Sequence, residues 1–254
     1  MRVEKSSLHE RLKREALVGP FSKTSDPNLI EAMGYGGFDF VILDLEHGPN
    51  DIVNLGNLIR AAERTGLSAV VRVLTTNQIG RALDLGAAAI QIPHISTAED
   101  AQRAVESARF GPMGKRGVCR YVRAAEHSSM EKGLYFSSAN EISVIAQVEG
   151  RAGLENLVQI LEVPGVDVIF LGVYDLSQSL GFTGEVERRE VVDALSEVVR
   201  LCAAKGIPVG TFVESVETAH CYRQLGVQYL CYSVDVGLLF EASRAISTAV
   251  KRAK

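Results

Sequence analysis

Short apolar runs rich in β-branched residues recur along the chain, separated by longer stretches with helical periodicity. Most of these runs are apolar at nearly every position, which is typical of strands buried on both faces of a parallel sheet. Eight strands are expected, at 16–23, 38–46, 68–74, 87–93, 142–149, 166–172, 207–213 and 227–235. Helices are expected at 51–65, 77–85, 97–109, 151–162, 187–205, 215–225 and 237–252.

Capping residues and glycines support this alternation. Asp51, Thr97 and Ser215 precede helical stretches, where a side-chain oxygen can accept a hydrogen bond from the first turn. Glycines that suit helix C-caps lead into five of the strands, at Gly66, Gly86, Gly165, Gly206 and Gly226. Strands that alternate with helices of this length predict a parallel sheet of the α/β class.

Eight strand–helix units in 254 residues predict a single (β/α)₈ TIM barrel that spans residues 1–254. An open, doubly wound sheet is the alternative. That fold is less favoured because no G-x-G-x-x-G motif follows the first strand.

Composition and charge narrow the class of protein. The chain is 46% hydrophobic and 23% charged, with a net charge of −4, so a basic nucleic-acid-binding surface is not expected. The apolar runs are shorter than the ~20 residues of a membrane helix. The charged, amphipathic segment 1–17 predicts an N-terminal helix and not a signal peptide. The four cysteines lack CxxC spacing, which indicates reduced thiols and a cytoplasmic protein.

Polar side chains concentrate where the predicted strands end. The segment FVILDLEHGPND (40–51) passes from apolar residues directly to Asp44, Glu46 and His47. Buried carboxylates are costly unless they are paired or bind a metal, and barrel active sites lie at the C-terminal ends of strands. Other strands end in the same way, at Gln91 to His94, Gln147 to Glu149, Tyr174 to Asp175 and Ser233 to Asp235. These endings predict one functional pocket.

Glu149 and Asp175 are the carboxylates expected to bind a metal ion. Gln147 and Glu149 are two residues apart and therefore share one face of a strand. Two carboxylates from neighbouring strands suit a hard cation such as Mg²⁺ or Mn²⁺. The alternative is that each carboxylate caps a following helix. The turn in GVYDLSQSLG (172–181) would also direct backbone N–H groups of Tyr174 and Asp175 at an anion.

Four further residues suggest chemistry. Arg72, within an apolar strand, must face a pocket, where it could hold developing negative charge, or form a buried ion pair. His47 is either a general base or an exposed loop residue. Asp84 ends a helix, an unfavourable place for a carboxylate, so a partner is expected, with a histidine among the candidates. Of the eight lysines only Lys23 could form a Schiff base, so metal stabilisation of an enolate is favoured.

Several motifs occur in an order that resembles the class II pyruvate aldolases of the HpcH/HpaI family, which includes 4-hydroxy-2-oxoheptanedioate aldolase and the 2-keto-3-deoxy sugar-acid aldolases. They are GFDFVILDLEHGPND, VRV, LDLGAAAIQIPHISTAEDA, GPMGKRG, IAQVEG and FLGVYDLSQSLG, and the resemblance spans residues 15–240. It implies a (β/α)₈ barrel that forms a homo-hexamer, a trimer of dimers with exchanged C-terminal helices. It also implies reversible cleavage of a 4-hydroxy-2-oxo acid to an aldehyde and pyruvate, with a pyruvate enolate held at Mg²⁺, Mn²⁺ or Co²⁺.

The resemblance also implies roles for individual residues. Glu149 and Asp175 match the metal ligands. His47 matches the proton-abstracting residue, Asp84 the aspartate that raises its basicity, and Arg72 the arginine that steadies the enolate oxygen. Substrate-binding positions are implied at Gln147, Tyr174, Asp175 and Phe212, with Phe212 on the aldehyde side.

The chain departs from the family pattern in three places, one of which is the segment from Arg72 to Asp84, about two residues shorter than in some members. Val173 and Tyr174 replace a proline and a small residue, so the tyrosine ring could narrow the pocket. Arg120 and Arg123, in CRYVRAAEHSS (119–129), either meet an acidic substrate or lie on the surface. Two other functions remain open: a decarboxylase or carbon–carbon lyase acting on oxaloacetate-like acids, and a barrel without catalytic activity.

Overall fold

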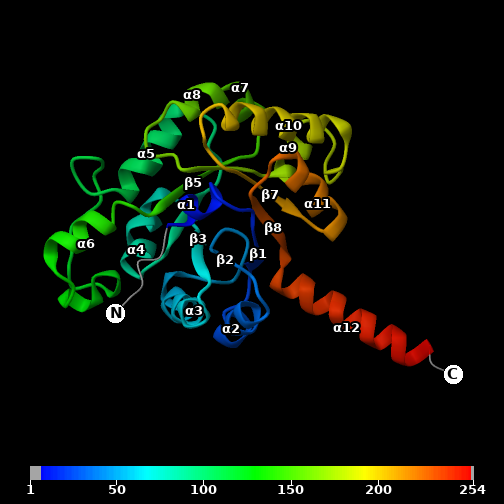
Figure 1. The fold of residues 1–254 in the computed structure, drawn as a ribbon, viewed down its shortest axis with the longest axis horizontal. Helices are drawn as coiled ribbons and strands as arrows, with labels where there is room; N and C mark the ends of the chain where they lie inside the picture. Colours follow the sequence, from blue (N-terminus) through cyan, green and yellow to red (C-terminus); the bar gives the residue numbers. More distant parts are fainter. Residues whose placement is uncertain (1–6, 253–254) are drawn as a thin grey trace.

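Eight parallel strands form a closed barrel in chain order, with β8 paired to β1, in a computed structural model that describes residues 7–252 (Figure 1). The strands are β1 (Leu17–Ser22), β2 (Phe40–Asp44), β3 (Ser68–Arg72), β4 (Ala89–Ile92), β5 (Ser143–Val148), β6 (Val168–Leu171), β7 (Val209–Val213) and β8 (Tyr229–Val234). All eight predicted strands and the predicted TIM barrel are confirmed.

Helices surround the barrel. They are α1 (Leu8–Leu12), α2 (Pro27–Tyr35), α3 (Ile52–Thr65), α4 (Ile79–Asp84), α5 (Ala98–Ala108), α6 (Lys132–Ser138), α7 (Arg151–Glu155), α8 (Leu157–Leu161), α9 (Val173–Ser179), α10 (Arg189–Ala203), α11 (Val216–Leu225) and α12 (Asp235–Arg252), with 3₁₀ turns η1 (Thr76–Gln78) and η2 (Arg123–Ser128). The predicted helix 151–162 is two short helices that meet at Asn156. The N-terminal helix is confirmed at α1; residues 1–6 of the expected segment lie outside the described part.

Local signals explain several helix boundaries. Asp51, Thr97 and Ser215 each accept a hydrogen bond from the first turn of the helix that follows. Gly66 and Gly226, as predicted, end α3 and α11 in the left-handed conformation, where a side chain would be strained. Sequence patterning did not find α2 and α6, which are only nine and seven residues long.

Two apolar layers hold the barrel together. The inner layer fills the barrel with large side chains such as Phe40, Phe170 and Tyr229, and the rings of Phe40 and Tyr229 lie 4.3 Å apart. Leu8 and Leu12 of α1 belong to the same layer. The outer layer lies between the strands and the surrounding helices. At about 25 cal/mol per Å² of apolar surface removed from water, these layers are the main source of stability.

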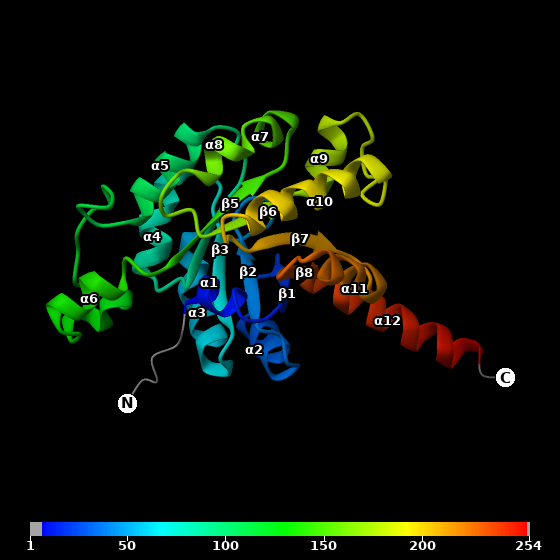
Figure 2. The ribbon, with the colours of Figure 1, turned by 45° about the horizontal axis from the view of Figure 1, so that its top comes forward.

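The last helix leaves the barrel. Figures 1 and 2 show α12 extending away from β8 into open space. It exposes apolar side chains along its length, at Val236, Leu239, Phe240, Ile246 and Val250. Within residues 7–252, no helix is both long enough and apolar enough to cross a membrane.

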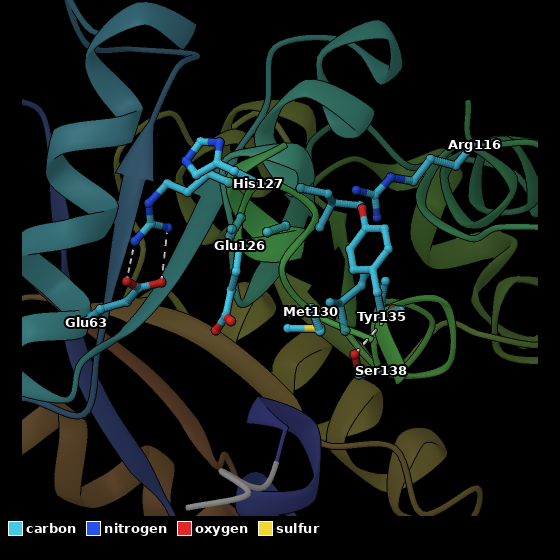
Figure 3. Close-up of a pocket in the computed structure, with 14 residues that line it drawn as sticks. Glu63, Arg116, Glu126, His127, Met130, Tyr135 and Ser138 are labelled. Atoms are coloured by element: carbon cyan, nitrogen blue, oxygen red, sulfur yellow. Dashed lines mark hydrogen bonds and ion pairs between the residues drawn. The ribbon is translucent and has the colours of Figure 1, made fainter. Parts of the chain in front are cut away.

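An appendage formed by residues 109–142 stands beside the barrel and includes η2 and α6. A cavity of about 430 Å³ lies between it and the ends of α3 and α4, and Figure 3 shows Glu63 across this cavity from Tyr135. Arg123 pairs with Glu63 and donates to the carbonyl of Leu85, while Arg120 donates to two carbonyls of the appendage. Both arginines therefore attach or shape the appendage.

Candidate active site

A cavity of about 420 Å³ opens at the C-terminal ends of the strands. Seven of the eight strands, or the residues that directly follow them, contribute to its lining. Six of the predicted site residues line it: His47, Arg72, Gln147, Tyr174, Asp175 and Phe212. The tertiary structure thus brings together predicted site residues that are up to 165 positions apart in the chain, from His47 to Phe212.

A buried ion cluster forms one wall of the cavity. Asp44 and Arg72 stand side by side on β2 and β3, and Arg72 donates from Nε and Nη2 to the two oxygens of Asp44 at 2.9 and 2.7 Å. Lys23 Nζ donates to Asp44 Oδ2 at 2.9 Å. Burial raises the pKa of Asp44, but hydrogen bonds and charge from Arg72 and Lys23 outweigh it and hold that pKa well below its usual range. Arg72 is therefore both an ion-pair partner and a cavity residue.

Two more carboxylates are buried behind this cluster. His94 approaches both: Nδ1 lies 2.6 Å from Glu149 Oε1, and Nε2 lies 3.0 Å from Glu46 Oε1. The His94 backbone N–H also donates to Glu149 Oε1, at 2.7 Å. Burial raises the pKa of Glu149, and the charge of Glu46 adds to this, against hydrogen bonds from Gln147 and His94 that lower it. A positive charge placed beside Glu149 would lower this pKa again.

The side chain of Glu149 is fixed in place from two sides. Gln147 donates to Glu149 Oε2 and accepts a hydrogen bond of 2.6 Å from Gln91. Gly172 packs so closely that a Cβ there would lie 2.8 Å from the Cβ of Glu149 and 2.9 Å from its Oε2. This crowding explains why the residue directly after β6, at position 172, is glycine.

The capping alternatives for the two expected metal ligands are wrong. Helix α7 begins after Gly150, and Glu149 accepts from His94 instead of capping that helix. Helix α9 begins after Gly172, which places Asp175 within the first turn and not at the N-cap. Both carboxylates are therefore available for another role.

The charges of the site fit a divalent cation. Asp44 forms ion pairs with both Lys23 and Arg72. Glu46 pairs with Arg72, with 3.1 Å between Arg72 Nη1 and Glu46 Oε2. Glu149 and Asp175 are two further carboxylates, and neither forms an ion pair with Lys23 or Arg72. Within residues 7–252, no three His, Cys, Asp or Glu side chains are already gathered as a metal cluster. A cation would therefore take the two carboxylates together with oxygens from water or substrate, as Mg²⁺ and Mn²⁺ accept.

The expected contact between Asp84 and His47 is not formed within the chain. Asp84 ends α4, which runs back along the barrel, and so lies at the end opposite to the cavity. Its partner is Arg116, with Nη2 2.7 Å from Oδ1, and not a histidine. The carboxylate nearest to the imidazole ring of His47 is that of Glu46, 3.8 Å from Nε2.

The distal wall of the cavity is aromatic and acidic. Tyr174, in the first turn of α9, donates from its hydroxyl group to Glu214 Oε2 at 2.6 Å. Burial and the carboxylate of Glu214 raise the pKa of Tyr174 to about 12, so the phenol remains a donor. The ring of Phe212 lies edge-on to that of Tyr174, at 5.8 Å. Tyr174 does shape the cavity.

Sequence reasoning did not assign roles to Glu46, His94 and Glu214. The first two follow strands, in DLEH and QIPH, and that position was the available signal. Their mutual contact depends on the closure of the barrel, which no local pattern reports. Glu214 directly follows β7, but a single exposed glutamate before a helix has no distinguishing pattern.

Comparisons with known proteins identify the family of the chain. The HpcH/HpaI aldolase/citrate lyase family model matches residues 17–242. The chain belongs to this family. It is 32% identical over 243 residues to a 2-dehydro-3,6-dideoxy-6-sulfogluconate aldolase of Pseudomonas putida, covering 94% of this chain and 95% of that protein. A 5-keto-4-deoxy-D-glucarate aldolase of Shigella boydii serotype 18 is also 32% identical, with coverage of 94% and 93%.

A solved structure of an HpcH/HpaI aldolase/citrate lyase family protein from Burkholderia cenocepacia superposes on this chain with a TM-score of 0.91. It is 34% identical and covers 97% of this chain and 100% of its own. Membership of the family and the named aldolase relatives make this HpcH/HpaI protein a lyase of the aldolase type.

Proposed function

We propose that this HpcH/HpaI protein is a divalent-metal-dependent aldolase that reversibly cleaves a 4-hydroxy-2-oxo acid to pyruvate and an aldehyde. The observation that carries the proposal is the buried Glu149, whose pKa is raised by burial, beside a cavity that Asp175 and Arg72 line. This arrangement supports a site that needs a cation and that can stabilise developing negative charge.

Glu149 and Asp175 would hold the cation, which is Mg²⁺ or Mn²⁺ by the preference of carboxylates for hard ions, with Co²⁺ as a further candidate. When bound, the cation supplies a Lewis acid that polarises the 2-oxo group of the substrate. Gln147, which keeps Glu149 oriented, also lines the cavity and can donate to the substrate. Backbone N–H groups of Tyr174 and Asp175, in the first turn of α9, suit the pyruvate carboxylate.

The protein groups then account for the proton and charge movements. His47 takes the proton from the 4-hydroxyl group, the C3–C4 bond breaks, and its electron pair forms the enolate of pyruvate as the aldehyde leaves. Arg72 has five N–H donors, of which Asp44 accepts one from Nε and one from Nη2, while Nη1 forms an ion pair with Glu46. The remaining donors can stabilise the enolate oxygen. The proton held by His47 then passes to C3, which completes pyruvate and restores the histidine.

We further propose that the protein is a cytoplasmic homo-oligomer, a hexamer built as a trimer of dimers with exchanged α12 helices. The exposed apolar side chains of α12, such as Leu239 and Phe240, support this because apolar surface of this kind favours burial against another copy. In such an assembly, Asp84 of one copy could reach His47 of another. The four cysteines form no disulfide, in keeping with a reducing compartment.

The test is pyruvate release from a panel of 4-hydroxy-2-oxo acids, measured in EDTA and after addition of Mg²⁺ or Mn²⁺. We expect no activity in EDTA and full recovery with metal, with one aldehyde formed for each pyruvate. The Glu149→Gln variant should lose metal-dependent turnover, and calorimetry with Mn²⁺ should show weakened binding. Glu155→Gln, on the exposed outer helix α7, is the matched control.

Two results would contradict the proposal. Undiminished activity in EDTA would remove the metal from the reaction. Pyruvate formed from oxaloacetate without activity on any 4-hydroxy-2-oxo acid would favour the decarboxylase alternative.

A further inference from the structure

We infer that Glu214 selects the aldehyde partner, favouring an uncharged hydroxyaldehyde and rejecting one whose far end carries a carboxylate. The inference rests on the proposed aldol reaction and adds the chemical class of the second substrate. Glu214 directly follows β7 and lines the same cavity as His47, Arg72 and Asp175. Its side chain therefore faces whatever occupies the space beyond the pyruvate-binding end.

Among the charges around the cavity, that of Glu214 decides which aldehyde can bind. The two cations that line the cavity are already engaged by buried carboxylates: Lys23 and Arg72 by Asp44, and Arg72 also by Glu46. Within residues 7–252, Glu214 forms no ion pair with a cationic side chain, and its contact is the neutral hydroxyl group of Tyr174. An anionic group that reached this wall would meet a carboxylate without gaining a free cation.

The same wall offers good contacts to a hydroxyl group. A carboxylate has about four lone-pair sites, and Tyr174 uses one of those on Oε2, so Glu214 can accept further hydrogen bonds from substrate hydroxyls. The Tyr174 and Phe212 rings, 5.8 Å apart, provide apolar surface for the carbon chain. The Tyr174–Glu214 hydrogen bond also links the residues after β6 and β7, which keeps the carboxylate on the cavity wall.

The experiment runs the reaction in the condensation direction, with pyruvate, Mn²⁺ and matched aldehydes. Glycolaldehyde carries a hydroxymethyl group where glyoxylate carries a carboxylate, and the two are otherwise the same. A longer pair, 4-hydroxybutanal and succinic semialdehyde, differs in the same way. Wild type should prefer the hydroxyaldehyde by kcat/KM in at least one pair. Glu214→Gln keeps the shape and removes the charge, and should reduce that preference on the order of tenfold, as expected for one charge at close range.

Two further variants separate charge from shape. Tyr174→Phe removes the donor and leaves the carboxylate, so rejection of the anionic aldehyde should persist. Glu217→Gln, in the exposed first turn of α11, removes a nearby charge that does not line the cavity and should leave the preference as in wild type. In wild type, added salt should weaken the discrimination, because salt screens exposed charges.

The outcomes distinguish the inference from the reaction on which it rests. The inference is overturned if wild type prefers the anionic aldehyde in both pairs. The proposed reaction would still stand in that case, provided that wild type exchanges the methyl protons of pyruvate in D₂O and forms adducts. An unchanged preference in Glu214→Gln would do the same. If no aldehyde forms an adduct and no proton exchange occurs with Mn²⁺, both the proposed reaction and the inference fail.

Discussion

Loss of the Asp44 carboxylate should destabilise the barrel markedly. Asp44 is fully buried, and Asp44→Asn would keep its shape while leaving Arg72 and Lys23 without their shared partner. Removing one partner of a buried ion pair costs about 3–5 kcal/mol. For a chain of this length, an unfolding entropy of about 0.5 kcal/mol per degree converts that loss to a fall in Tm of about 6–10 °C.

Thermal unfolding followed by far-UV circular dichroism measures this, in EDTA so that bound metal does not contribute to stability. Asp193→Asn is the matched control, because Asp193 forms an exposed ion pair of 3.4 Å with Arg189 on the surface of α10. Exposed pairs contribute about 0–1 kcal/mol, so its Tm should fall by less than about 2 °C. Equal shifts in the two variants would show that the cluster around Asp44 does not behave as a buried ion network.

The pH dependence follows from the same carboxylate. Its folded-state pKa lies below the unfolded value of about 3.9, because Arg72 and Lys23 outweigh the effect of burial. A lowered pKa contributes stability above the unfolded value, and this contribution is lost as pH falls through the folded value. The Tm difference between wild type and Asp44→Asn should therefore stay constant from pH 7 to about 5 and narrow below about pH 4. If this Tm difference begins to narrow above pH 5, the lowered pKa of Asp44 is refuted.

Three further predictions concern the chemistry. His47→Ala should slow aldol cleavage more than oxaloacetate decarboxylation, since only cleavage needs a base at the 4-hydroxyl group; equal losses would contradict this role. Gly172→Ala places a methyl group 2.8 Å from the Cβ of Glu149, so Mn²⁺ affinity measured by calorimetry should fall at least tenfold, and unchanged affinity would exclude Glu149 as a ligand. Borohydride with pyruvate should leave the protein mass unchanged because Lys23 Nζ is engaged in an ion pair with Asp44; a reduced pyruvyl adduct on Lys23 would restore the Schiff-base mechanism.

Much of the fold follows from local physics that the sequence states directly. A strand buried on both faces must be apolar throughout, and a surface helix must be apolar on one side, so the two periodicities separate the elements. Glycines such as Gly66 and Gly226 mark helix ends because they adopt the left-handed conformation without strain. Short helices such as α2 and α6 were missed because nine and seven residues span too few turns to establish a helical period.

The sequence by itself also located the candidate site, because in a closed barrel the polar strand ends meet at one mouth. Arg72 and Glu149 could be named from their positions alone. Only the tertiary structure decided the partners. It joined Arg72 to Asp44, brought Glu149 and Glu46 onto His94, and placed Asp84 against Arg116 at the opposite end.

The difference has a physical cause. Whether a residue is apolar, extended or helical depends mainly on its near neighbours, which the sequence displays. Which charges meet depends on strand register and barrel closure, which bring distant segments within hydrogen-bond distance. Asp44 and Arg72 meet because β2 and β3 pair in one register, and a shift of one residue would turn either side chain to the other face. The sequence determined the barrel and the end at which its site lies, and the tertiary structure decided how its charges pair.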